Sequence, residues 1–377
     1  MAKKKLLIFI DWYKPGYKAG GPIRSISNLT ATLGDKLDIH IITRDTDYLE
    51  TTPYTIIESN KWNIIDSTKV YYLSNNNINR TNIKKLIQEV NPELVYCNSL
   101  YSPYFTLIPI YLAKKLNIQS VLAIRGMLSE GSLGVKSHKK KLFLLVTKTI
   151  GLFKKCTFHA TTIDEKKAIQ NTFGKQTPII IAQNLPEKKN IPFQEKEKEV
   201  NHLRIVNIGR VAPEKNTLYA LEVLKEITSN ILFDIYGPIY DQGYWDKCKV
   251  IISQLPKNVV VNYKGVLPHK DLDGVLKNYQ VFFSPSTGEN FGHSIIEAMI
   301  NSCIPIISDQ TPWVKLEEKN IGFDLPLNAP LLFAKKIDQL ALMDKSTLNK
   351  ISYKTHQFAK KTINDHELIK KYTILFK

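Results

Sequence analysis

The feature that most constrains the fold is an alternation of short apolar runs with longer segments of helical spacing, which continues along most of the chain. Strands that alternate with helices predict βαβ units and a doubly wound, largely parallel sheet. Residues 44–69 are less regular, and we expect a loop or a hairpin there. The runs that read as strands are Leu6–Ile10, Ile39–Thr43, Val70–Leu73, Leu94–Cys97, Val121–Ile124, Phe158–Thr161, Ile179–Ala182, Leu203–Ile208, Leu232–Tyr236, Val259–Tyr263, Val281–Ser284 and Ile304–Ser308.

A polar stretch separates two sets of strands. Residues 186–202 read PEKKNIPFQEKEKEVNH, with two prolines, many charges and few apolar residues. That composition is typical of an interdomain linker, and a chain of 377 residues favours two domains. We therefore predict Rossmann-like domains over residues 1–187 and 203–345, a linker over 188–202, and C-terminal helices over 346–377 that pack back towards the first domain. A cleft between the two domains is the expected active site.

The net charge, the cysteines and the lengths of the apolar runs limit the kinds of partner and the cellular compartment that we expect for this protein. The net charge of +17 favours an anionic partner, which can be nucleic acid, a phosphorylated ligand or an anionic membrane surface. The four cysteines form no CxxC pair, so neither a disulfide framework nor a structural zinc site is expected. No apolar run approaches 18 residues, so no membrane-spanning helix is expected. We expect a cytoplasmic protein, soluble or peripheral on the inner face of the membrane.

The most informative segment carries two glutamates in the context of a strand, a loop and a helix. A buried strand ends near Ser284, Glu289 lies in the following loop, and a helix begins near Gly292 with Glu297 on it. The first N–H groups of such a helix can bind an anion, helped by the helix dipole. Glu297 could then hold ribose hydroxyls, and Glu289 could hold those of a sugar. The alternative is that both carboxylates are solvated and have no role.

A second segment places two cations after a strand. Gly209 and Arg210 follow the strand that ends at Ile208, and Lys215 lies where the next helix opens. Fixed positive charges at this edge would stabilise a diphosphate as it leaves. The alternative is that Arg210 pairs with a surface carboxylate and Lys215 is solvated.

Together, residues 209–216 (GRVAPEKN) and 285–299 (PSTGENFGHSIIEAM) resemble the motifs of glycosyltransferase family 4. The resemblance implies the GT-B fold, with acceptor binding in the first Rossmann-like domain and a nucleotide-sugar, UDP- or GDP-linked, in the second. It implies catalytic roles for Arg210, Lys215 and Glu289. It implies donor-binding roles for Gly20, Gly21, Arg125, Gly209, Gly237, Val266, Asn290, Phe291, Gly292, His293, Ser294 and Glu297. Arg125 stands where the family commonly has a histidine, in the segment 125–128 (RGML).

Metal binding is not expected. The chain contains two Asp-x-Asp tripeptides, Asp45–Asp47 in a polar loop and Asp271–Asp273 at the start of a helix, where capping is the simpler interpretation. If the GT-B resemblance holds, Arg210, Lys215 and the helix N-terminus replace a cation. No cofactor and no metal are therefore predicted, and the nucleotide-sugar is a substrate.

One further segment indicates a membrane surface. Val135–Lys155 contains seven lysines and no acidic residue, and its apolar residues recur at roughly helical spacing. This pattern suits a basic amphipathic helix on an anionic membrane. It equally suits a helix that packs its apolar side on the core and solvates its lysines.

The predicted function is a hexosyl-type glycosyltransferase that moves a sugar from a nucleotide-sugar to an acceptor. The acceptor is predicted to be a lipid-linked saccharide in the synthesis of a bacterial surface polysaccharide such as O-antigen, lipopolysaccharide or capsule. The resemblance implies retention of anomeric configuration. The alternatives are a sugar-nucleotide epimerase or a phosphorylase on the same fold, or a nucleic-acid-binding protein, for which no motif is present.

Overall fold

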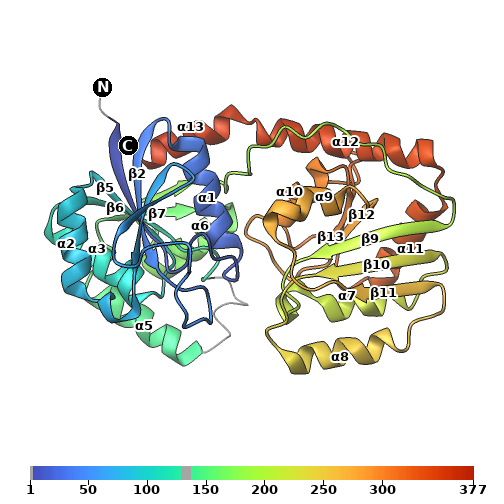
Figure 1. Cartoon of the computed structure of the whole chain (residues 1–377), viewed down its shortest axis with the longest axis horizontal. Coiled ribbons are helices and arrows are strands. Elements are labelled where there is room, and N and C mark those ends of the chain that lie inside the picture. Colours follow the sequence, from blue (N-terminus) through green and yellow to red (C-terminus); the bar gives the residue numbers. More distant parts are fainter. Residues whose placement is uncertain (1–2, 129–136) are drawn as a thin grey trace. The chain divides into compact units, whose positions relative to one another are not determined.

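The computed structural model describes residues 3–128 and 137–377. The chain divides into two compact units. The first contains Met1–Lys188 together with Asp365–Lys377, and the second contains Lys189–Asn364. Each unit is built on a parallel or nearly parallel sheet with helices on both faces (Figure 1). The predicted fold class of two doubly wound α/β domains followed by C-terminal helices is confirmed.

The sheet of the first unit has the order β3-β4-β2-β1-β5-β6-β7-β8. All neighbours are parallel except β3 and β4, which form an antiparallel hairpin inside the irregular region 44–69 and just after it. The strands are β1 (Lys4–Phe9), β2 (Leu37–Arg44), β3 (Trp62–Ile65), β4 (Thr68–Leu73), β5 (Leu94–Asn98), β6 (Gln119–Ala123), β7 (Cys156–Ala160) and β8 (Ile179–Ile181).

Alternate residues of each strand pack on opposite faces of this sheet, as the pleat requires. Leu7 and Phe9 of β1 pack with α2 and α3, whereas Leu6 and Ile8 pack with α1 and the C-terminal α13 (Figure 1). The helices are α1 (Gly21–Leu33), α2 (Arg80–Val90), α3 (Ile108–Lys115), α5 (Ser137–Thr149), α6 (Ile163–Phe173) and α13 (His366–Leu375). Short helical turns lie at Asn75–Asn77 and Pro103–Leu107.

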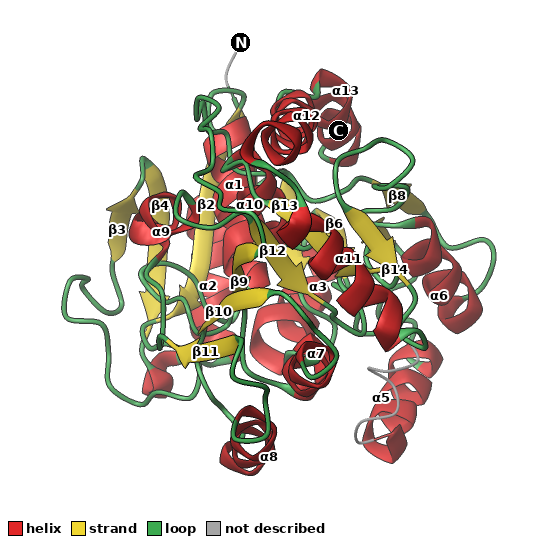
Figure 2. Cartoon of the chain, turned by 90° about the vertical axis from the view of Figure 1, so that its right-hand side faces the viewer, coloured by secondary structure: helices red, strands yellow, loops and turns green. Residues whose placement is uncertain are grey.

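The sheet of the second unit is fully parallel, in the order β11-β10-β9-β12-β13-β14. The chain therefore adds strands on one side of β9 and then returns to add them on the other side, which is the doubly wound pattern. The strands are β9 (His202–Ile208), β10 (Asn230–Tyr236), β11 (Val259–Tyr263), β12 (Val281–Ser284), β13 (Ile304–Ser308) and β14 (Phe323–Leu325). They are among the yellow arrows in Figure 2, which shows the strands of both sheets.

Two hydrophobic clusters cover the faces of the second sheet. Helices α7, α8 and α11 pack on one face and α9, α10 and α12 on the other. Their bounds are α7 (Thr217–Leu224), α8 (Gln242–Ile252), α9 (Leu272–Leu276), α10 (His293–Ile300), α11 (Pro330–Leu342) and α12 (Lys345–Ile363), with 3-10 turns at Pro213–Lys215 and His269–Asp271. No helix among the described residues is long and apolar enough to cross a bilayer.

The polar stretch before β9 has no helix or strand, and it is fastened to the second unit by a buried lysine. The ammonium of Lys196 donates to the carbonyls of Leu276, at 3.0 Å, and Lys277, at 3.2 Å. Its backbone N–H donates to Asn349 Oδ1 of α12 at 2.8 Å. Burial lowers the pKa of Lys196. Helix α12 belongs to this unit, whereas α13 belongs to the first, so the C-terminal helices are divided between the two.

Candidate donor site

The candidate site lies where the order of strands in the second sheet reverses, between β9 and β12. These two strands are neighbours, with Val281 opposite Ile205 and Phe282 opposite Val206. The side chain of Asn207, near the end of β9, donates to the carbonyl of Phe283 at 2.7 Å. In open α/β sheets, ligands bind at the carboxyl ends of strands at such a point. The two segments selected from the sequence, after Ile208 and after Ser284, leave the sheet here.

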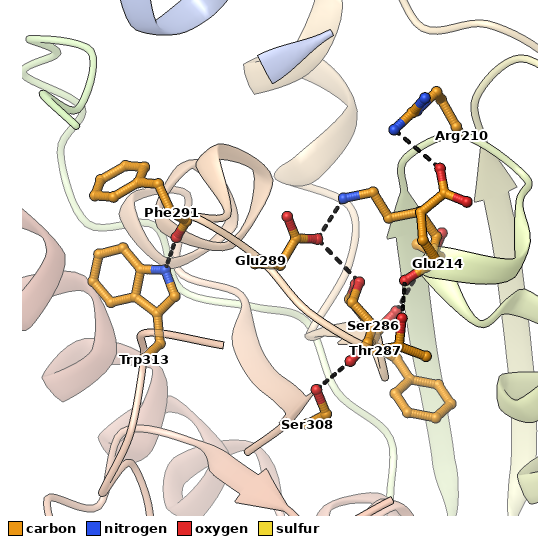
Figure 3. A network of polar contacts seen from close by, with 12 residues as sticks. Arg210, Glu214, Ser286, Thr287, Glu289, Phe291, Ser308 and Trp313 are labelled. Atoms are coloured by element: carbon orange, nitrogen blue, oxygen red, sulfur yellow. Dashed lines mark hydrogen bonds and ion pairs between the residues drawn. The ribbon is translucent and has the colours of Figure 1, made fainter. Parts of the chain in front are cut away.

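Lys215 and Glu289 meet across this edge. The Lys215 ammonium forms an ion pair with Glu289 Oε1, and both side chains are largely buried (Figure 3). The hydroxyl of Ser286 donates to the same carboxylate oxygen at 3.0 Å. The carbonyl of Ser286 in turn accepts a hydrogen bond from Ser308 Oγ at the end of β13. The Glu289 carboxylate is therefore held by groups that three adjacent strands position.

Arg210 lies beside this pair and is more exposed. Its guanidinium forms a 3.0 Å ion pair with Glu214, four residues later (Figure 3). The backbone carbonyl of Glu214 accepts hydrogen bonds from the N–H of Thr287, at 3.0 Å, and from its hydroxyl, at 3.3 Å. The loop after β12 is thus tied to the turn that carries Arg210 and Lys215. An ion pair exposed to this degree contributes little to stability. A diphosphate could therefore replace Glu214 as the partner of the Arg210 guanidinium with little loss of free energy.

The backbone of the neighbouring strand ends is closely packed, and one glycine makes this possible. Gly237, after β10, has φ +147°, and a Cβ there would overlap the carbonyl of Gly209. Gly209 N–H donates to the Tyr236 carbonyl at 2.9 Å, and Gly237 N–H donates to Gly265 at 2.8 Å. The aliphatic part of Lys215 lies 3.7 Å from the position of a Cβ on Gly209. Val266, which follows Gly265, is 43% exposed.

Helix α10 begins at this edge with Gly292 in the left-handed region, at φ 75°. Among the described residues no side chain caps this helix end. The preceding carbonyl, of Phe291, accepts a hydrogen bond from the indole N–H of Trp313, and the two rings pack edge to face at 5.4 Å (Figure 3). His293 packs on Phe291 with ring centroids 4.8 Å apart. The backbone of Asn290, just before Phe291, and of Ser294, just after His293, belongs to the same turn.

Glu297 lies on α10 and is 5% exposed. Its Oε1 lies 3.4 Å from Nε2 of His269, in the turn after β11. Asn301, at the end of the helix, donates to the Glu297 backbone carbonyl at 2.8 Å and to Asp273 at 2.9 Å. The carboxylate of Glu297 is thus held next to an imidazole that the sequence did not single out.

Three predicted donor-binding residues belong to the first unit. Gly20 caps the N-terminus of α1 at φ 73°, and Gly21 begins the helix. Open space surrounds the Cβ position of each.

Arg125 follows β6 and is engaged in a network that the sequence did not indicate. Its guanidinium donates to Asn98 Oδ1 at 2.6 Å, to Asn184 Oδ1, and to the Tyr96 hydroxyl at 2.8 Å. Tyr96 lies 2.9 Å from Nδ1 of His159, whose Nε2 lies 2.7 Å from the Ala182 carbonyl. Burial, followed by the Arg125 charge, lowers the pKa of His159 to about 3. Arg125, which follows β6, therefore contacts β5 and the segment after β8 directly, and β7 through Tyr96. Its donor-binding role stays a prediction.

The first sheet also reverses its strand order, between β1 and β5, and a carboxylate lies there. Asp11 follows β1, and its Oδ1 accepts a 2.9 Å hydrogen bond from Ser102 and lies 3.8 Å from the Arg44 guanidinium. Burial raises the pKa of Asp11, while Ser102 and Arg44 act in the opposite direction. A carboxylate in this position can accept a hydrogen bond from a sugar hydroxyl.

Both Asp-x-Asp tripeptides are occupied by contacts within the chain. Asp47 accepts backbone N–H groups of Tyr17 and Lys18, and Asp45 accepts the Ser59 hydroxyl at 2.7 Å. Asp273 pairs with Lys189 at 2.9 Å. Asp271 does occupy the N-cap position of α9, but its side chain makes no capping hydrogen bond within the described residues. The capping interpretation is therefore wrong, because Asp271 has helical dihedral angles, whereas a capping side chain normally stands on an extended residue.

Sequence reasoning missed four side chains that hold the site: Ser286, His269, Trp313 and Glu214. Ser286 and Glu214 lie inside the two selected segments, so their proximity to Glu289 and Arg210 could have identified them. His269 and Trp313 are far from Glu297 and Phe291 along the chain, and only the tertiary fold brings them together.

The sequence matches one known family over most of the second unit. Residues 187–358 match the family described as glycosyl transferases group 1. Among curated proteins, the chain resembles the GtfA subunit of the UDP-N-acetylglucosamine–peptide N-acetylglucosaminyltransferase of Streptococcus agalactiae, at 29% identity over 223 residues. The match covers 55% of this chain and 42% of that protein. The Streptococcus parasanguinis GtfA subunit is 26% identical over 162 residues, which are 41% of this chain and 30% of that protein. The chain therefore spans less than half the length of these relatives.

Solved structures show that the chain has the GT-B fold. The structure of HepE from Anabaena, in complex with UDP and glucose, aligns with a TM-score of 0.71 at 15% identity, covering 99% of this chain and 98% of that chain. An Escherichia coli protein described as "trehalose-6-phosphate", bound with UDP-2-fluoro glucose, aligns with a TM-score of 0.68 at 10% identity and 99% coverage of both. At these identities the similarity establishes the fold alone, and it extends over both units.

Proposed function

We propose that this protein is a glycosyltransferase that takes its sugar from a nucleotide-sugar bound at the carboxyl edge of the second sheet. The observation that carries this proposal is the gathering of Arg210, Lys215 and Glu289 where β9 and β12 end. Two cations, a buried carboxylate and an uncapped helix N-terminus then face the same place. The diphosphate would contact Arg210, Lys215 and the first N–H groups of α10, because all of these carry positive charge.

Glu289 and Glu297 would contact the parts of the donor other than its diphosphate. We assign the ribose hydroxyls to Glu297 and the sugar hydroxyls to Glu289, whose carboxylate is fixed by Lys215 and Ser286. As negative charge develops on the leaving diphosphate, the positive charges of Arg210 and Lys215 stabilise it more strongly than they stabilise the bound donor. We further propose retention of anomeric configuration and no requirement for a metal.

A UDP-linked sugar is the proposed donor. UDP-N-acetylglucosamine appears in the names of the GtfA relatives, and UDP or a UDP-sugar derivative is present in the two aligned structures. Two acceptors are proposed. A lipid-linked saccharide in surface polysaccharide synthesis is the acceptor predicted from the sequence. A peptide is favoured by the names of the relatives.

The donor site is tested first by thermal unfolding with UDP, GDP, ADP and their sugar conjugates. A ligand at 100 times its Kd adds about 2.7 kcal/mol to the free energy of unfolding. We expect a selective rise in Tm with UDP compounds that is smaller in Glu297→Ala. No rise with any nucleotide would contradict the proposal. Transfer of labelled sugar to lipid extracts or to peptides then distinguishes the two acceptors.

A further inference from the structure

Helix α5 of the first unit exposes apolar side chains where a helix of a water-soluble domain usually carries polar ones. Leu142, Leu145 and Val146 are 62%, 60% and 47% exposed, and Ile150, in the turn after the helix, is 61% exposed. Leu142, Val146 and Ile150 are four residues apart and Leu145 lies three residues after Leu142, so all four lie on one side of the helix. The opposite side of the helix packs inward, with Phe143 contacting Tyr101 at a ring-centroid distance of 5.0 Å.

A groove runs beside this row. Its volume is about 540 Å³, and Leu142, Val146 and Ile150 line one side while Leu107, Ile108 and Tyr111 line the other. The groove is therefore apolar along its length. Two cations, Arg80 from the start of α2 and Lys139 from the first turn of α5, also line it.

Positive charge surrounds the groove. The guanidinium of Arg80 and the ammonium of Lys115 both lie 5.1 Å from the centre of the Tyr111 ring. A hydrogen bond with Lys115 and the charges of both groups lower the pKa of Tyr111. Within residues 3–128 and 137–377, neither Arg80 nor Lys139 is paired with a carboxylate. From residue 131 to residue 163 the sequence contains no Asp or Glu.

We propose that this surface, the α5 face, binds an anionic phospholipid membrane. Leu142, Leu145, Val146 and Ile150 enter the interfacial region, one acyl chain occupies the groove, and lipid phosphates pair with Arg80 and Lys139. An exposed apolar row gains free energy when it leaves water, and basic residues beside it are attracted to anionic lipid. A protein partner would be a different occupant, but Arg80 and Lys139, which have no carboxylate partner in the described part of the chain, lie beside an apolar groove and favour a phospholipid. The first two residues of the predicted membrane segment, 135 and 136, lie outside the described residues.

The inference goes beyond the proposed sugar transfer, and its test requires neither donor nor acceptor. The full chain is floated with vesicles of phosphatidylcholine alone or of equal parts phosphatidylcholine and phosphatidylglycerol. We expect binding to the anionic vesicles that weakens as salt is raised, because salt screens the charges. Binding to neither vesicle, or equal binding to both, would overturn the proposal, and the first result would point to a protein partner.

Two variants separate charge from apolar contact. Arg80→Glu with Lys139→Glu should reduce vesicle partitioning at least tenfold. This variant should still fold, because acidic residues in the first turns of α2 and α5 interact favourably with the helix dipoles. Leu142→Gln with Val146→Gln and Ile150→Gln should reduce it to a similar extent. The matched controls lie in the second unit: Lys247→Glu with Lys277→Glu, and Val250→Gln with Leu331→Gln and Leu342→Gln, all at exposed positions. Wild-type partitioning in both α5-face variants would overturn the proposal.

A labelled cysteine gives an answer that does not depend on the folding of those variants. All four native cysteines are buried, so an environment-sensitive dye attaches selectively at Leu145→Cys. We expect a blue shift of its emission with anionic vesicles and none for the control Val250→Cys. Unchanged emission at residue 145 would place the α5 face outside the membrane.

Discussion

Lys215 and Glu289 form an ion pair at the carboxyl edge of the second sheet, where β9 and β12 leave it. Their residues are 74 positions apart in the sequence, and the pairing of the two strands brings them together. A lysine held by a carboxylate keeps its charge in a fixed place, and a carboxylate held by a lysine keeps its orientation. The ion pair therefore holds the ammonium in position for a phosphate group and the carboxylate in position for a hydroxyl group of a ligand.

Removal of the Lys215 charge should reduce turnover more than it reduces donor affinity. We expect Lys215→Ala to lower kcat by roughly a hundred- to a thousand-fold, as loss of one preorganised group does at other transferring centres. Steady-state kinetics with the UDP-sugar identified by thermal unfolding measure this. Lys249→Ala is the matched control, because that lysine pairs with Asp246 on the exposed surface of α8, away from the site. Equal kcat in Lys215→Ala and wild type would remove Lys215 from the site.

Glu297 should contribute to donor binding through hydrogen bonds to its carboxylate. We expect Glu297→Ala to weaken UDP binding by about 1.5–3 kcal/mol, the range for charge-assisted hydrogen bonds. Isothermal titration calorimetry with UDP measures the change directly. Glu222→Ala on α7 is the control, since that residue pairs only with Lys225 on the helix surface in the described structure. An unchanged Kd in Glu297→Ala would reject the ribose assignment.

Gly237 should be irreplaceable for reasons of backbone geometry. We expect Gly237→Ala to lower the free energy of unfolding by at least roughly 1–3 kcal/mol, the cost of a strained backbone conformation, with overlap on the Gly209 carbonyl in addition. Gly274→Ala is the control, because it lies within α9 with open space around its Cβ position. There we expect a gain of about 0.5–1 kcal/mol from the loss of helix-interior glycine. Chemical denaturation compares the two, and similar stability of both would contradict the prediction.

His159 should make the stability of the first unit fall in acid. Its pKa is about 3 in the folded chain against a reference of 6.5, so below pH 6.5 the unfolded chain binds one more proton. The free energy of unfolding then decreases as pH falls, by about 1.4 kcal/mol per pH unit, across the window from 6.5 to about 3. His159→Gln should flatten this slope in urea titrations at several pH values. The same slope in wild type and His159→Gln would show that other groups cause it.

Metal chelation should leave transfer unaffected. Asp47 and Asp273 are bound to groups of the chain itself, and the proposed charge on the diphosphate side comes from Arg210 and Lys215. Initial rates should therefore be the same with excess EDTA and with added magnesium or manganese. Loss of activity in EDTA, restored by one of these ions, would contradict the prediction.

Most of the fold could be predicted because its strands are buried on both faces and read as apolar runs. Each run that the sequence analysis identified corresponds to a strand. It missed Phe323–Leu325, a three-residue edge strand whose pairing with β13 defines it more than its own composition does. The hairpin β3–β4 was left open because its first strand has only four residues, none of them fully buried, and shows no clear alternation.

The site could be predicted only where its residues lie close together in sequence. The two selected segments carry Arg210, Lys215, Glu289 and Glu297, and the fold brings them to one edge. The contact of His269 with Glu297 depends on the packing of α9 and α10, which no local pattern encodes. The engagement of Arg125 by Asn98 and Asn184 depends on three separate strand ends in the same way.

The return of α13 to the first unit determines the order in which the chain can complete its domains during synthesis. Tyr372 and Leu375 fill the core beside α1, and they are made only after every residue of the second unit. Domains generally fold as units as they leave the ribosome. The second unit can therefore finish folding first, while the first waits with one face of its sheet covered by α1 but not yet by α13. A chain truncated after residue 364 would keep every residue of the second unit and would leave the first unit without α13.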